Sequence, residues 1–126
     1  MAIQAIRDDL RRRVTVTLQA AVSPSDVTAF IAARAPVPGG DQPYDILVDL
    51  RFAQVDVSTS AQAQSLAAAA ERLQPNRRHG RVAVVVEDDV TFGIARMYAA
   101  YREKTGITIE VFRRIEDAEG WLAGLR

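Results

Sequence analysis

The sequence predicts an α/β domain with a mixed sheet, and two segments carry most of that prediction. Asp45–Leu50 and Arg81–Glu87 are nearly continuous apolar runs, as in strands that are covered by protein on both faces. A segment with helical spacing follows each run, which indicates parallel strands joined by right-handed crossovers. A strand hairpin at the start of the chain would make the sheet mixed.

The other strands are predicted from shorter patterns. Residues 2–7 form a first strand, with Asp8-Asp9 as the turn into the next one. Arg13–Gln19 alternates valine and leucine with threonine and glutamine, which is typical of a half-buried strand towards a sheet edge. Ile107, Ile109 and Val111 alternate with polar residues in the same way and indicate a final, less buried strand.

Four helices are predicted between and after these strands. The first begins at Ser23-Pro24-Ser25-Asp26 and runs to about Arg34, before a loop rich in proline and glycine. The second covers Ser60–Gln74, and its alanine run Ala67–Ala70 should allow close approach to the sheet. The third follows a cap at Asp88 or Asp89 and ends at Lys104-Thr105-Gly106, and the last covers Glu116–Leu125.

Length and composition indicate one domain over residues 1–126. Sixteen basic residues balance sixteen acidic ones, so a general attraction to nucleic acid is not indicated. The chain has no cysteine, which excludes disulfides and thiolate chemistry. No apolar run is long enough for a membrane helix and the N-terminus lacks the apolar core of a signal peptide, so we expect a cytoplasmic location.

Acidic side chains form the first candidate site. Asp49, Glu87, Asp88 and Asp89 follow or interrupt the two buried strands, so they could converge on Mg²⁺ or serve an Asp/Glu-dependent enzyme. VVVEDD is similar to the acidic pair of a receiver domain, but in receivers that pair precedes the phosphoacceptor and here it follows Asp49. The favoured interpretation of Asp88 and Asp89 is helix capping, with no metal and no cofactor.

Hydroxyl side chains form the second candidate. Asp56, Ser58, Thr59 and Ser60 precede or open the second helix, where a phosphate would be stabilised by the helix N-terminus. A simple capping cluster is the alternative. The only histidine, His79, lies before a strand at the opposite sheet edge, so no Ser-His catalytic pair is predicted.

Two further groups have a functional and a structural interpretation. The run Arg77-Arg78-His79-Gly80-Arg81 could form a basic patch with Arg11-Arg12-Arg13, although a solvated loop is favoured. The third helix has its inward face at Ile94, Met97, Tyr98 and Tyr101. A small apolar ligand pocket is predicted from four residues on and near that helix, with ordinary core packing as the alternative: Phe92, Met97, Tyr98 and Trp121.

The chain resembles the STAS superfamily of sulphate-transporter and anti-sigma-factor-antagonist domains, and most closely the small stand-alone bacterial proteins called STAS-like. Three segments carry the resemblance: YDILVDLRFAQVDVSTS, RVAVVVEDDVTFGIARMYAAYRE and VFRRIEDAEGWL. It implies a STAS-like mixed β-sheet of four to five strands with about four helices packed mainly on one face.

The resemblance also implies a regulatory role. In antagonist-type STAS domains a Leu-Asp-Leu strand leads into Asp-Ser-Ser-Gly, and a partner kinase phosphorylates one serine. Val48-Asp49-Leu50 matches the strand, and Asp56, Ser58, Thr59 and Ser60 fall where the motif would lie. Here Val57 follows the aspartate, and no glycine follows the hydroxyls.

We therefore expect a non-enzymatic regulatory or protein-interaction domain. The alternative is a carrier of a small molecule or lipid, which requires an apolar cavity near the third helix. A protein partner, a small apolar ligand and a homodimer remain open at this point.

Overall fold

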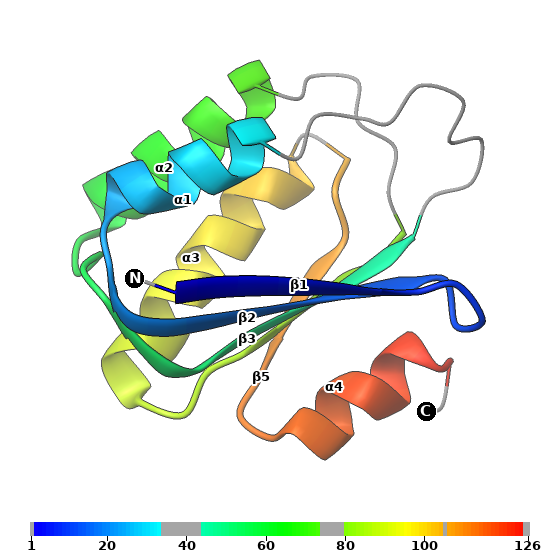
Figure 1. Ribbon diagram of the computed structural model, residues 1–126. Coiled ribbons are helices and arrows are strands. Elements are labelled where there is room, and N and C mark those ends of the chain that lie inside the picture. The colour runs from blue at the N-terminus through cyan, green and yellow to red at the C-terminus, as the bar shows by residue number, and fades with distance from the viewer. Residues whose placement is uncertain (1, 34–43, 74–79, 105, 125–126) are drawn as a thin grey trace.

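The computed structural model describes residues 2–33, 44–73, 80–104 and 106–124, and these form a five-stranded sheet with four helices (Figure 1). The elements follow one another as β1 (Ala2–Asp8), β2 (Arg13–Val22), α1 (Pro24–Ala33), β3 (Asp45–Val55), α2 (Ser60–Leu73), β4 (Val82–Val85), α3 (Asp89–Glu103), β5 (Ile109–Phe112) and α4 (Ile115–Leu122).

The five strands lie in the sheet in their order along the chain. β1 pairs with β2 as an antiparallel hairpin, and every other neighbouring pair is parallel. The predicted mixed sheet is therefore confirmed. β2 is second from the edge, because β1 forms the edge itself.

β3 is longer than predicted and contains an irregularity. Thr17 pairs with Asp49, whereas Gln19 pairs with Phe52, so β3 advances by one residue more than β2. Such an extra residue is a β-bulge, which bends the strand and re-aims its side chains. Beyond the bulge, β3 continues to pair with β2 as far as Val55 opposite Val22. This pairing explains why the strand continues past Leu50, where the apolar run of the sequence ends.

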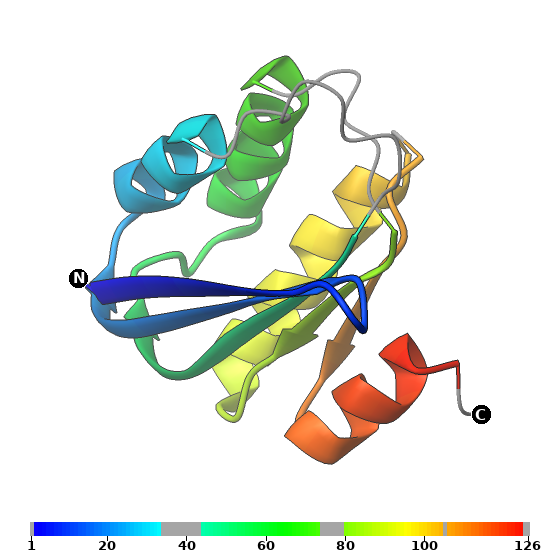
Figure 2. The same cartoon turned by 45° about the vertical axis from the view of Figure 1, so that its right-hand side comes forward.

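The helices lie on both faces of the sheet, with three on one face and one on the other. In Figures 1 and 2, α1, α2 and α3 cover one face, while α4 lies alone across the opposite face. The predicted packing of the helices mainly on one face is confirmed. Between α4 and the sheet lies a small apolar cluster, which we call the α4 cluster: Leu47, Ala83, Val85, Ala118 and Leu122.

The core on the other face divides into two neighbouring clusters. One is built on β2 from Val14, Val16, Leu18 and Val22, with Val27 and Phe30 of α1 packed against it. The other is formed by Val84 of β4 with Val86 just after it, Ala99 of α3 and Ile109 of β5. Alternate residues of β3 and β4 thus face opposite helix layers, which explains why these strands are apolar throughout.

The ends of α3 follow the predicted capping chemistry. The Asp88 carboxylate accepts a hydrogen bond of 2.8 Å from the Thr91 backbone N–H, so Asp88 is the N-cap. That hydrogen bond is the main reason why the pKa of Asp88 lies below its ordinary value. Gly106, just after the helix, has a φ of 89°, a left-handed conformation that suits glycine.

The remaining boundaries shift by a few residues. The predicted strand Arg81–Glu87 is regular only over Val82–Val85, and α4 begins at Ile115, one residue earlier than predicted. It ends at Leu122, whereas Leu125 lies outside the described residues. Within the described segments, no helix combines the length and the apolar character that crossing a membrane requires.

Candidate functional site

An apolar cavity of about 240 Å³ lies between the sheet and the layer of α1, α2 and α3. Valines and isoleucines of β2, β3 and β4 line its sheet side, among them Val16, Val48 and Val84. The helices supply the opposite side. Three of the residues there are alanines: Ala63 and Ala70 of α2 and Ala95 of α3.

Small side chains on α2 explain why this space is not filled. The inward face of the helix carries Ala63, Leu66, Ala67 and Ala70, all buried. A single methyl group extends less far from the helix than a leucine or isoleucine side chain would. The alanine run was predicted to allow close approach of α2 to the sheet. This prediction is wrong, because Ala70 borders the cavity instead of packing against a strand.

The polar groups of the cavity come from one face of α3. Thr91, Tyr98 and Arg102 line it, and Tyr98 and Arg102 are one helical turn apart. Burial raises the pKa of the Tyr98 phenol, and the positive charge of Arg102 offsets part of that rise. The phenol therefore stays protonated at neutral pH and can donate a hydrogen bond.

Arg102 connects this face of α3 to α2. Its side chain is only 6% exposed, and its Nη1 lies 3.4 Å from the Glu71 Oε2, whose side chain is 38% exposed. The ion pair thus has one buried end and one end near solvent. The sequence analysis predicted neither Glu71 nor Arg102 as a site residue. Arg102 nevertheless lies four residues after Tyr98, on the same face of the helix.

The predicted apolar set is not brought together as one pocket. Phe92 and Tyr98 pack against the same cluster, but only Tyr98 lines the cavity. Met97 is 42% exposed, because it lies a full residue step, about 100°, away from the inward stripe of α3. Trp121 belongs to α4 and contacts Phe112 on the opposite face of the sheet, with ring centroids 5.7 Å apart. The grouping of these four residues is therefore wrong.

The hydroxyl cluster forms the N-terminal cap of α2. Thr59 Oγ1 accepts the Gln62 N–H at 3.2 Å, and Gln62 Oε1 accepts the N–H groups of Ser58 at 2.9 Å and Thr59 at 3.2 Å. This reciprocal arrangement is a capping box. Asp56, Ser58 and Ser60 are exposed beside it. The capping interpretation is thereby confirmed for Thr59, while the proposed phosphorylation of the two serines stays a prediction.

The acidic residues predicted to form one site have separate structural roles. Asp49 is buried and paired with Arg51, Asp88 caps α3, and Asp89 forms an ion pair of 2.5 Å with Arg113. Among the described residues, no three Asp, Glu or His side chains are placed to hold a metal ion together. The hypothesis that these carboxylates converge is wrong, because Asp49, Asp88 and Asp89 are each bound by a different neighbour.

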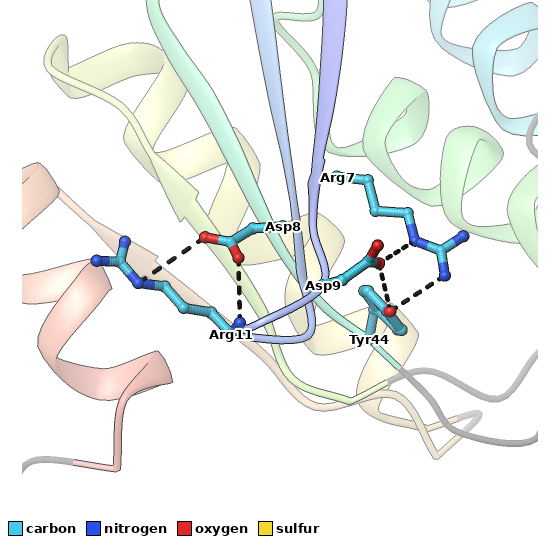
Figure 3. Close-up of polar contacts among 5 residues, drawn as sticks. All are labelled: Arg7, Asp8, Asp9, Arg11 and Tyr44. Atoms are coloured by element: carbon cyan, nitrogen blue, oxygen red, sulfur yellow. Dashed lines mark hydrogen bonds and ion pairs between the residues drawn. The ribbon is translucent and has the colours of Figure 1, made fainter.

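At the β1–β2 turn, Arg7 and Arg11 meet acidic partners (Figure 3). Arg7 Nε lies 2.6 Å from Asp9 Oδ1, which also accepts the Tyr44 hydroxyl at 2.7 Å. These two hydrogen bonds, that from Tyr44 first, hold the pKa of Asp9 below its ordinary value. Arg11 donates its backbone N–H to Asp8 at 3.1 Å. Of the predicted run Arg11–Arg13, Arg11 is thus paired with a carboxylate, Arg12 lies 5.9 Å from the Tyr44 ring centroid, and Arg13 is buried.

Only part of the basic run Arg77–Arg81 can be placed. Arg77, Arg78 and His79 lie outside the described residues. Arg81 donates to the Leu122 carbonyl at 2.7 Å, and its guanidinium lies 4.9 Å from the Trp121 ring centroid. It therefore attaches the end of α4 to the sheet.

Comparison with known proteins identifies the fold. No family model matches the chain, and no curated protein matches it significantly. The solved structure of an uncharacterised protein of the DUF3478 family from Shewanella loihica, described as having a SpoIIAA-like fold, is similar with a TM-score of 0.56. The match covers 96% of this chain and 92% of that chain at 16% sequence identity. At this identity the likeness establishes the SpoIIAA-like, STAS-like fold predicted from the sequence.

Proposed function

We propose that this chain is a non-enzymatic domain that binds a small apolar molecule between its sheet and α1–α3. The observation that carries the proposal is the apolar cavity of about 240 Å³. An engineered apolar cavity of roughly 150 Å³ is already large enough to bind benzene. The volume here therefore suits a small hydrocarbon body, such as a short acyl chain or an aromatic ring.

The side chains that could have carried catalysis support a non-enzymatic role. Asp49 is engaged by Arg51, Asp88 by the α3 backbone and Thr59 by the α2 cap. Each of these groups has a structural partner, and none of the three lines the cavity. We place the domain in the bacterial cytoplasm on the basis of its resemblance to small stand-alone STAS-like proteins.

The test uses a matched pair of alanines from the same run of α2. Ala70 lines the cavity, whereas Ala68 is exposed. N-phenyl-1-naphthylamine, a neutral apolar fluorophore, should bind the wild-type protein with increased emission. Ala70→Leu should weaken its binding by at least about tenfold, because the larger side chain occupies the cavity, and Ala68→Leu should bind as the wild type does.

Two outcomes would contradict this proposal. One is the absence of saturable fluorophore binding to the wild-type protein, and the other is equal binding by the two variants. Far-UV circular dichroism of both variants shows that any loss of binding occurs in a folded protein.

The α2 cap favours a second candidate, a phosphorylation-controlled interaction domain. Ser58 and Ser60 expose their side chains on either side of Thr59 at the start of a 14-residue helix. Phosphate at a helix N-terminus is stabilised by the helix dipole and free N–H groups. Mass spectrometry of protein isolated from its native cells should then find phosphate on Ser58 or Ser60, and unmodified peptides under all growth conditions would rule this candidate out.

A further inference from the structure

We propose that the ligand of the cavity is a neutral molecule with an apolar body and one carbonyl oxygen, and that the Tyr98 hydroxyl donates a hydrogen bond to this oxygen. The inference rests on the proposed apolar binding function and adds the chemical class of the ligand. It follows from a hydrogen-bond donor in the cavity wall to which the described residues supply no acceptor.

Of the polar side chains that line the cavity among the described residues, two are bound by other parts of the protein. Thr91 lies at the start of α3, where its backbone N–H and its side chain both bind the Asp88 carboxylate. Arg102 is paired with Glu71 of α2 and has further interactions of its own. The third is Tyr98, and the other lining residues are apolar.

The Tyr98 hydroxyl has no hydrogen-bond partner within the described residues. Burial is the larger influence on its pKa and raises it, so the hydroxyl keeps its proton at neutral pH. A buried hydroxyl without an acceptor is unfavourable, because it has lost its hydrogen bonds to water. A ligand that supplies an acceptor would restore a hydrogen bond on binding.

The charge of Arg102 favours an acceptor over a second donor beside Tyr98. The guanidinium is close enough to the phenol for its positive charge to lower the pKa of Tyr98. A positive charge attracts the negative end of a dipole, which in a carbonyl group is the oxygen. Although a phenol oxygen can also accept hydrogen bonds, donation to a ligand oxygen suits this environment better.

The apolar wall favours a neutral acceptor over a carboxylate. Moving an ionised carboxylate out of water costs far more free energy than moving a neutral carbonyl group. The positive charge of Arg102 on the cavity wall is already opposed by Glu71. A second carboxylate would therefore gain less from Arg102 than an unopposed charge would offer.

The position of Tyr98 leaves room for an apolar body along the same stripe of α3. Ile94 and Ala95 line the cavity one helical turn before Tyr98. Val48 and Val84 line it from the sheet. A ligand with its carbonyl oxygen at Tyr98 would place its hydrocarbon against these side chains.

Acetophenone and α-methylstyrene separate the hydrogen bond from apolar character. They share one planar shape and differ only in a carbonyl oxygen in place of a methylidene carbon. NMR chemical-shift titrations at neutral pH should show that Tyr98→Phe weakens acetophenone binding about tenfold and leaves α-methylstyrene binding unchanged. Each ligand is compared with itself in the two proteins, so their different solvation in water cancels.

Tyr101→Phe is the matched control, because it removes the same hydroxyl from the same helix. Tyr101 is not among the residues that line the cavity, and the Lys104 Nζ lies 5.6 Å from its ring centroid. This variant should bind both ligands as the wild type does.

Urea unfolding without ligand provides a readout that does not depend on binding. Tyr98→Phe should unfold at a urea concentration equal to or higher than that of the wild type, because the hydroxyl that it removes has no partner. A clearly lower midpoint would show that the hydroxyl is bound within the protein, and would overturn the inference.

The titrations distinguish this inference from the function on which it rests. If both ligands bind, both are weakened by Ala70→Leu and neither responds to Tyr98→Phe, the role of Tyr98 is overturned and the apolar cavity proposal stands. If neither ligand binds the wild-type protein, both proposals fail.

Discussion

Asp49 interrupts an apolar strand, and its local partner explains how the fold tolerates it. Its side chain is only 7% exposed, and both carboxylate oxygens accept hydrogen bonds from the Arg51 side chain, at 2.9 and 2.8 Å. The Arg51 backbone N–H adds a third bond at 3.1 Å. Burial raises the pKa of Asp49, but the bonds from Arg51 outweigh it, so the pKa lies below its ordinary value.

Asp49→Asn should destabilise the protein in a pH-dependent way. A lowered pKa means that the ionised carboxylate stabilises the folded state above about pH 4 and loses this effect as the pH falls through the folded-state pKa. We expect a loss of about 1–3 kcal/mol at pH 7 that diminishes below pH 4. Urea unfolding followed by circular dichroism at several pH values measures it.

Glu116→Gln provides the comparison at an exposed ion pair. Arg114 and Glu116 lie 3.6 Å apart, with side chains 71% and 68% exposed. Such pairs contribute little, so the change should stay below about 0.5 kcal/mol at pH 7. A similar effect of the two substitutions at pH 7 would contradict the structural role given to Asp49.

At the scale of elements, α2 shows how a good helix can pack incompletely. Its alanines favour the helical conformation, and the capping box at Thr59 and Gln62 fixes where it begins. Because alanine side chains are small, the same residues do not fill the space between the inward face of α2 and the sheet. α4 has the opposite character, because its fully buried Ala118 packs in one cluster with Ala83 of β4.

This contrast predicts the effect of filling the cavity from α2. Ala70→Leu should raise the free energy of unfolding by about 1 kcal/mol, since the added methylene groups enter apolar space. In a fully packed core the same change would cost about 1–3 kcal/mol. Ala68→Leu, on the exposed face, should change it by less than about 0.5 kcal/mol. Denaturant unfolding of the wild-type protein, Ala70→Leu and Ala68→Leu measures these free energies. A loss of stability in Ala70→Leu would show that the space beside Ala70 is already packed.

At the scale of the whole molecule, two layers of unequal packing enclose one sheet. α4 lies against the sheet through a small cluster, and Arg81 holds its end through the Leu122 carbonyl. α1, α2 and α3 cover the other face (Figure 2), and the cavity lies between them and the sheet. The ligand binding proposed above would therefore involve α1–α3 and one face of the sheet, on the side away from α4.

The sequence by itself determined the order of strands and helices along the chain and a cap at Asp88 or Asp89, because these depend on local periodicity and on side chains close in the chain. It also located the hydroxyls at the start of α2. Only the tertiary structure decided which face each helix covers, and so separated Trp121 from Tyr98. It alone revealed the cavity and the contact of Arg102 with Glu71, which lies 31 residues earlier. The physical reason is that empty volume and pairing across helices depend on how far apart the layers stand, and no local pattern encodes that distance.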